Sequence, residues 1–279
     1  MNIGLIQRSL REVWFASLAM SGIVFGITAL FCYAMPRVQA RFAQRSFIPQ
    51  GVRQFRDAIF GGVDSTGANI AEIAYAIAWS HPLVLVPILT HAILVQTRVP
   101  AAEVERGTVD VLLALPVSRW NLYVSETVAW LLTAIVTLGA MYGGAYFGSM
   151  FINPDIRAVA TPDWGRLAMV LANLGLVYMV VGCVASFFTT IIDRRTWAVL
   201  CTLVLTLFSL LVSFLYTIDP ALEFTKSMRF LSILDYYKPL AILRSGDWQL
   251  RDMGILASTA FTLWIVTGII FARRDITTT

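Results

Sequence analysis

The sequence predicts an all-α membrane protein with six transmembrane helices in one domain, residues 1–279. Hydrophobic residues make up 58% of the 279 positions and charged residues only 14%, well below the quarter that is typical of soluble domains. Several runs of about twenty residues carry almost no charge, and a helix of that length crosses roughly 30 Å of hydrocarbon. The runs lack the polar–apolar alternation of β-barrel strands. Each run is therefore expected to form a helix, which satisfies its backbone hydrogen-bonding groups internally.

The first segment, residues 1–12, places Ile3, Ile6 and Leu10 at helical spacing opposite charged side chains. This pattern predicts a short interfacial helix that leads into a first span at about 13–35. Signal-peptide cores run about 7 to 15 residues, so we interpret this longer stretch as a retained span.

The later spans are separated by polar or charged segments. Pro82 and Pro87 predict a bend in the second span, and glycines of the third predict close helix packing on one face. A short charged link joins spans four and five into a hairpin, and an external segment of mixed polarity at 217–250 precedes the last span. The five later spans are expected at about 70–96, 122–150, 167–190, 197–216 and 253–272.

Composition excludes several function classes. The net charge of +4 comes from basic residues scattered between apolar runs, which argues against nucleic-acid binding. The cysteines lie in apolar runs without a C-x-x-C spacing, so neither disulfides nor zinc are indicated. Neither Lys226 nor Lys238 follows glycine, so the chain has no phosphate-binding P-loop. His81 and His91 lie about 80° apart around one helix and cannot face the same metal.

Polar residues inside spans are candidate functional groups because they are costly there. Glu72, Glu126 and His91 lie near span ends, where they can also reach lipid headgroups. His81 precedes Pro82 and can bond a carbonyl that the proline leaves free, and Asn173 can bond a neighbouring helix. For all of these residues a structural role competes with a place in a transport pathway.

The segment between spans two and three, residues 101–119, is the most informative. Thr108 can cap a short helix with Asp110 in its first turn, and Pro116 ends it. If the helix extends upstream, Glu103 and Arg106 share a face with Asp110, while leucines offer an apolar surface. The plain alternative is a solvated loop whose charges pair only with each other.

The pattern E-x-E-R-G-T-x-x-x-L-L-A-x-P-V-S-R at 103–119 resembles the cytoplasmic loop of type-2 ABC exporter permeases. The interfacial segment before span one, Tyr236-Tyr237-Lys238-Pro239 before span six and the ending Arg273-Arg274-Asp275 are also similar to that family. The resemblance implies a coupling helix that docks on an ATPase subunit, and short external helices that dip into the membrane. The ATPase-docking residues that it implies are Glu103, Glu105, Arg106, Gly107, Thr108, Asp110, Leu112, Leu113, Pro116 and Arg119.

For Tyr236 and Tyr237 an interfacial aromatic anchor and a gating role remain open. The resemblance implies the membrane subunit of an ATP-driven exporter, without catalytic residues of its own and with ATP and Mg²⁺ bound by the partner ATPase. Two permease copies, as a homodimer or a close heterodimer, would work among membrane lipids. Without a cluster of buried charges, the expected cargo is hydrophobic or amphipathic.

The expected location is the cytoplasmic (inner) membrane of a bacterium or archaeon, with many passes. Arginines crowd at span ends and short links, which places both termini in the cytoplasm. Three rivals stay open: an ion-coupled secondary transporter, an intramembrane enzyme, and a family member that acts mechanically on an extracytoplasmic partner. The first two require buried acid or histidine relays or matched catalytic groups, and the sequence shows neither.

Overall fold

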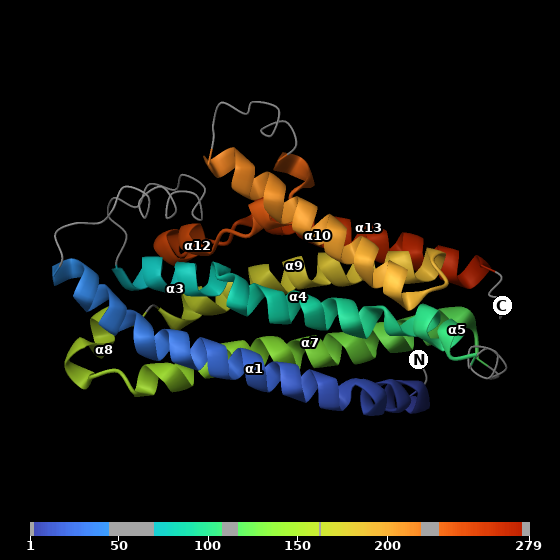
Figure 1. The fold of residues 1–279 in the computed structure, drawn as a ribbon, viewed down its shortest axis with the longest axis horizontal. Coiled ribbons are helices and arrows are strands. Elements are labelled where there is room, and N and C mark those ends of the chain that lie inside the picture. Colours follow the sequence, from blue (N-terminus) through green and yellow to red (C-terminus); the bar gives the residue numbers. More distant parts are fainter. Residues whose placement is uncertain (1–2, 45–69, 108–116, 162, 219–228, 275–279) are drawn as a thin grey trace.

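The computed structural model of the chain is an elongated bundle of helices that run side by side (Figure 1). It describes residues 3–44, 70–107, 117–161, 163–218 and 229–274, and these ranges contain no strand. Within these ranges five helices are long and apolar enough to cross a membrane, and there are six if one bent helix pair counts as a single span. The predicted all-α membrane architecture is therefore confirmed.

Long and short helices alternate along the chain. The long ones are α1 (Ile3–Gln44), α7 (Arg119–Met150), α9 (Trp164–Ile191), α10 (Arg195–Ile218) and α13 (Leu250–Arg273). The short ones are α3 (Ile70–Ser80), α4 (Pro82–Gln96), η1 (Arg98–Ala102), α5 (Glu103–Glu105), α8 (Pro154–Ala160), η2 (Arg229–Leu231), η3 (Ile233–Tyr236) and α12 (Pro239–Ser245). Ser118, Asn153 and Asp163 cap α7, α8 and α9 by accepting from backbone amides of the first turn, which explains where these helices begin.

The second span is broken, as its prolines predict. α3 ends at Ser80, and Pro82 occupies the first position of α4, where a missing amide hydrogen costs no helical bond. Pro87 lies inside α4. The bend that the structure shows lies after α4, where the segment Arg98–Glu105 makes an angle of 62° with it. Val99 has extended backbone angles at this kink.

The first helix differs from its prediction. α1 runs without interruption from Ile3 to Gln44, so residues 3–12 are its first turns and not a separate interfacial helix. Leu5 and Val13 are buried against the rest of the chain, whereas Ile3 is exposed. Contacts within the protein therefore help to hold this segment in line with the span.

Helices α1 and α7 pack along their length, and two glycines let them approach. A Cβ atom on Gly144 would overlap the carbonyl oxygen of Phe25, and one on Gly148 would overlap that of Ala29. The close packing expected for the glycines of span three is confirmed. By contrast, a Cβ atom on Gly22 would meet nothing within 4 Å in the described chain.

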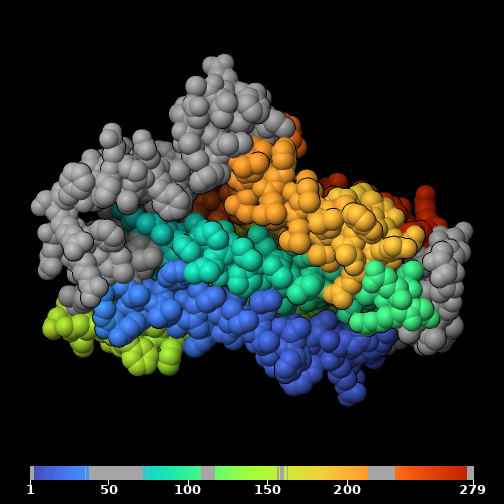
Figure 2. Space-filling view, viewed as in Figure 1, coloured from blue at the N-terminus to red at the C-terminus, as the bar shows by residue number. Residues whose placement is uncertain are grey.

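The two ends of the bundle carry different elements (Figure 1). The start of α1, α5, the link between α9 and α10, and the end of α13 gather at one end, which we call the loop end. α8, α12 and the start of α3 lie at the other, which we call the far end. On one face of the molecule α1, α4 and α10 lie side by side (Figure 2).

Candidate functional site

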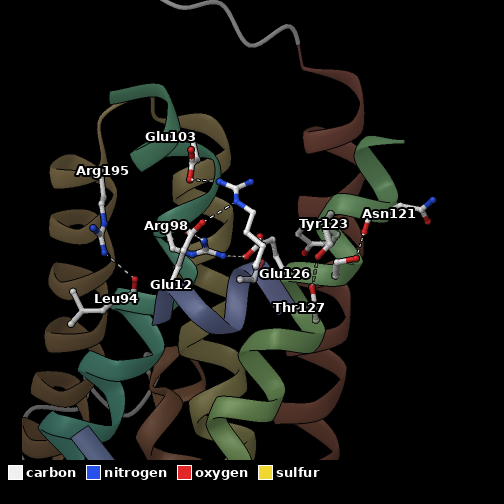
Figure 3. Close-up of polar contacts among 12 residues, drawn as sticks. Glu12, Leu94, Arg98, Glu103, Asn121, Tyr123, Glu126, Thr127 and Arg195 are labelled. Carbon is white, nitrogen blue, oxygen red and sulfur yellow. Dashed lines mark hydrogen bonds and ion pairs between the residues drawn. The ribbon is translucent and has the colours of Figure 1, made fainter. Parts of the chain in front are cut away.

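Five charged side chains meet where the segment 101–119 leaves the bundle. We call them the root cluster: Arg8, Glu12, Arg98, Glu103 and Glu126 (Figure 3). Arg98 donates from Nη1 to Glu12 and from Nη2 to Glu126. Arg8 donates from Nε to Oε1 of Glu12 at 2.9 Å and from Nη2 to Oε1 of Glu103 at 3.3 Å. Acidic and basic side chains therefore alternate along the series of contacts, in the order Glu103, Arg8, Glu12, Arg98 and Glu126.

The root cluster connects four elements. Arg8 and Glu12 stand on α1, Arg98 on η1, Glu103 on α5 and Glu126 on α7. Arg98 is only 7% exposed and Glu103 only 2%. The side chains of Arg8 and Glu12 are more open, at 39% and 32% exposed. Ions withdrawn from water cost several kcal/mol each unless partners compensate them, so the pairs of Arg98 fix the relative positions of η1, α1 and α7 more firmly than the pair of Arg8 fixes α5.

Two further arginines close the loop end. Arg195 at the start of α10 donates from Nη2 to the carbonyl oxygen of Leu94 at 3.0 Å, which joins α10 to α4 (Figure 3). Arg119 donates from Nη1 to the carbonyl oxygen of Arg274, which joins the start of α7 to the end of α13. Carbonyl groups at helix ends lack intrahelical partners, so arginine donors there satisfy groups that would otherwise need water.

The structure separates the predicted docking residues. Glu103 is buried in the root cluster, Glu105, Arg106 and Gly107 are exposed, and Arg119 begins α7. The remaining predicted docking residues lie outside the described part of the chain: Thr108, Asp110, Leu112, Leu113 and Pro116.

The suggested upstream extension of the docking helix is wrong. α5 ends at Glu105, and Gly107 has φ of +67°, a left-handed conformation that ends a helix and favours glycine. Glu103 is held by Arg8 inside the bundle while Arg106 faces solvent, so these two residues do not share one docking face. Helical spacing suggested the shared face because a sequence does not reveal a turn at Gly107.

The two histidines have different structural settings. His81 caps α4, since its Nδ1 accepts from the amide of Leu83 at 3.2 Å; the sequence suggested a bond to a freed carbonyl instead. His91 is buried and does not reach headgroups, because its ring shares hydrogen bonds of 2.9 Å with Tyr178 Oη and with Ser17 Oγ. The described residues contain no group of three His, Cys, Asp or Glu residues that could hold a metal ion.

Asn173 bonds the segment before the last span. Its Nδ2 donates to the carbonyl oxygen of Tyr236 at 3.3 Å, and its Oδ1 accepts from the amide of Lys238 at the same distance. Tyr237 donates from its hydroxyl to the carbonyl oxygen of Trp79 at 3.2 Å. Burial raises the pKa of the Tyr237 hydroxyl still further above neutral pH, so the hydroxyl stays a protonated donor. η3 and the start of α12 are thus inserted among α3 and α9.

The two acidic span residues also bond within the protein. Glu72 on α3 lies 3.6 Å from Nη1 of Arg166 on α9, measured from Oε1. Glu126 belongs to the root cluster and additionally accepts from Ser9 Oγ at 2.5 Å. Each of the two glutamates therefore has a partner within the protein, so its charge does not require contact with lipid headgroups.

Residues 15–272 match the family model described as ABC-2 family transporter protein. The chain belongs to this family. No curated protein and no solved structure matched it. The protein is thus the membrane permease component of an ABC-2 type transporter, a transmembrane subunit without an ATPase domain. Partnership with an ATPase subunit follows from the family.

Sequence reasoning missed the root cluster of the permease. Arg8 and Glu12 both precede the first apolar run, four residues apart, whereas Arg98 lies at the end of another run. Arg98 and Glu126 are 28 positions apart. The available signal was the isolated charge of Arg98 between Thr97 and Pro100 at the end of an apolar run, since a charge in that position requires a partner.

Proposed function

We propose that the permease moves a hydrophobic or amphipathic molecule outward across the membrane, as one of two copies that work with two cytoplasmic ATPases. The segment that follows Gly107 would dock on the ATPase. The observation that carries this proposal is the root cluster, which lies directly before that segment. The ion pairs of the root cluster would transmit a movement of the docking loop to the membrane helices.

The path can be followed from contact to contact. Glu103 precedes the loop by a few residues and is bonded to Arg8 on α1. Arg98 lies at the bend after α4 and is bonded to both α1 and α7. Since paired buried charges resist separation, a displaced loop would carry α1, α4 and α7 with it. ATP-driven closure of the ATPases would in this way tilt the bundle.

The transport pathway would lie where the second and fifth spans of both copies meet. These spans correspond to α4 and α10, which share one face of the molecule (Figure 2). Large apolar side chains of α10 are exposed, among them Leu203, Val204 and Leu207. Exposed apolar side chains of this size support contact with a second copy or with lipid and hydrophobic cargo.

The loop end would face the cytoplasm. Four parts of the chain lie together at this end and would therefore share one side of the membrane (Figure 1). They are the start of α1, α5, the link after α9 and the end of α13. Arg11, Arg194 and Arg273 are exposed at this end. Basic residues close to span ends favour the cytoplasmic side.

The docking assignment is tested by variants in the loop. We expect Leu112→Asp to abolish most ATPase association, because a charge placed in an apolar contact without a partner costs on the order of 1–3 kcal/mol. Arg106→Glu should weaken association less, by about 1 kcal/mol or below. Copurification of the ATPase and cargo-stimulated ATP hydrolysis are the measurements.

The matched control is Arg251→Glu, which reverses an exposed charge in the first turn of α13, at the end of that helix opposite to the loop end. It should leave ATPase yield and hydrolysis unchanged. If both loop variants insert normally and also leave these measures unchanged, the loop is a solvated segment and the docking assignment is wrong.

A further inference from the structure

A hydroxyl of α9 bonds the chain at the bend that follows α4. Thr189 Oγ1 accepts from the amide of Ala101 at 3.3 Å and donates to the carbonyl oxygen of Thr97 at 3.5 Å. In a continuous α-helix the amide of Ala101 would donate directly to this carbonyl, which lies four residues earlier. The Thr189 side chain therefore bonds both groups of one helical pair, and a side chain inserted in this way is a common cause of a kink.

The backbone at the bend requires a partner of this kind. Val99 is extended, with φ of −116° and ψ of 131°, and Pro100 has no amide hydrogen to continue the helix. Thr97 and Ala101 are both buried, so water does not easily reach their backbone groups. Since an unpaired backbone group in such a place is costly, the Thr189 hydroxyl stabilises the bent form of the chain.

Other buried threonines of the bundle use their hydroxyls within their own helix. The hydroxyl of Thr190, the next residue of α9, donates to the carbonyl oxygen of Ser186, four residues earlier, at 2.8 Å. Four further threonines make the same bond to a carbonyl four residues earlier: Thr28, Thr137, Thr202 and Thr206. The Thr189 hydroxyl instead bonds another segment of the chain. Its polar group therefore serves the bend and not α9.

The α4 side of the bend is anchored by other contacts. Arg195 at the start of α10 donates from Nη2 to the carbonyl oxygen of Leu94 at 3.0 Å. Arg98, which still precedes the extended residue Val99, is held by Glu12 and Glu126 in the root cluster. This side of the bend therefore keeps its place without the help of α9.

The side that leads to the docking loop is held by Thr189 and by an ion pair that is more open to water. Thr189 accepts from the amide of Ala101, and both residues are buried. Glu103 accepts from Arg8 at 3.3 Å, but the side chain of Arg8 is 39% exposed, so this pair contributes less than a fully buried one. We therefore expect the direction of this side to depend on the Thr189 hydroxyl.

We propose that Thr189 is a positioning residue for coupling, because its hydroxyl sets the direction in which the chain leaves α4 for the docking loop. The inference rests on the proposed docking of that loop on the ATPase. Loss of the hydroxyl would let the segment turn relative to α4 without changing a side chain that touches the ATPase. A movement of the ATPase would then be transmitted less completely to the membrane helices.

The first test measures the bend in the permease alone, in nanodiscs, by pulsed electron paramagnetic resonance. Spin labels at Glu105→Cys and Arg273→Cys, which replace exposed side chains, report the direction of the segment relative to α13 after the native cysteines have been changed to alanine. Thr189→Val keeps the shape of the side chain and removes the hydroxyl. Glu105 lies four residues beyond Ala101, roughly 6 Å of helix, so a turn through half of the bend should shift the label distance by about 3 Å.

The second test uses the complex with the ATPase. Thr189→Val should lower cargo-stimulated ATP hydrolysis about fivefold, the factor that corresponds to one lost neutral hydrogen bond. Copurification of the ATPase should stay near the wild-type level, because the side chains that dock are unchanged. Thr189→Ser keeps the hydroxyl and should retain the wild-type label distance and hydrolysis.

Thr190→Val is the matched control, since it makes the same change one residue further along α9 in a side chain that is also buried. Its hydroxyl bonds its own helix, so label distance and hydrolysis should both stay as in the wild type. A wild-type distance in Thr189→Val would overturn the proposal. An equal shift in Thr190→Val or in Thr189→Ser would also overturn it, because the effect would then not come from the hydroxyl at the bend.

The variant Leu112→Asp separates this proposal from the docking assignment. If Leu112→Asp abolishes ATPase association but Thr189→Val shifts the distance with normal hydrolysis, docking is correct and the role of Thr189 in coupling is wrong. If Leu112→Asp has no effect either, the docking assignment fails, and the label distance alone decides whether Thr189 sets the bend.

Discussion

The two ends of the permease are held together by different chemistry. At the loop end, charged side chains from distant parts of the chain pair with one another in the root cluster. At the far end, η3 and α12 are held by neutral bonds, such as those from Asn173 and Tyr237 to backbone groups, and by the guanidinium of Arg166, which donates to carbonyl oxygens of α12. Lys238 adds an ion pair with Asp252 at 2.7 Å.

This difference teaches how each end responds to a force. A paired buried charge is costly to separate, so the loop end moves as one unit. Neutral hydrogen bonds contribute about 1 kcal/mol each, so the far end can rearrange by exchanging a few of them. We infer that ATPase movement enters at a stiff end and is released at a softer one.

The largest expected effect is at the stiff end. Arg98→Gln removes one base between Glu12 and Glu126, and breaking a buried pair in this way costs about 3–5 kcal/mol. The free energy of unfolding in mixed micelles, measured by denaturant titration, checks this value. Arg106→Gln is the exposed control and should change it by less than about 0.5 kcal/mol. Equal effects of the two variants would remove the distinction between root cluster and loop.

A smaller effect is expected from Asn173→Leu at the soft end. The variant leaves the carbonyl of Tyr236 and the amide of Lys238 without their side-chain partner, at a cost of about 1–3 kcal/mol. Hydrogen exchange should rise in residues 229–245 and stay unchanged in 98–107. A rise in both segments would show that the two ends open together.

Tyr237→Phe sharpens the same comparison. It deletes only the hydroxyl that donates to Trp79, and the ring keeps its packing, so a loss of about 1 kcal/mol is expected. Thermal unfolding monitored by tryptophan fluorescence measures it. Tyr146→Phe, in which the ring is half exposed, is the control and should unfold as the wild type does.

The smallest effect is expected at the surface of the loop end. Asp193→Asn removes the acidic partner of Arg274, and Asp193 is largely exposed, so the pair contributes between 0 and about 1 kcal/mol. The difference from wild type should vanish at high salt, because exposed pairs are screened. A loss as large as that of Arg98→Gln would mean that exposure does not separate strong from weak pairs here.

Charge and hydropathy predicted the spans, the break at Pro82 and the close packing of the third span without help from contacts. These features depend on residues near in sequence, such as a proline that removes an amide or glycines four residues apart. The docking residues beyond Gly107 stay a prediction. The bonds of His91 and Asn173 could not be predicted, because their partners lie 87 and 63 positions away.

The sequence by itself determined that this chain crosses a membrane several times, lacks a P-loop and carries the loop pattern of its family. Composition and short motifs suffice for such features, since hydrocarbon burial and a missing lysine need no tertiary context. Only the tertiary structure decided that α1 continues through residues 3–12, that Glu103 turns inward and that Arg98 joins three helical elements. Those outcomes depend on which charges meet when separate helices pack, and pairing of distant ions is set by the fold and not by spacing along the chain.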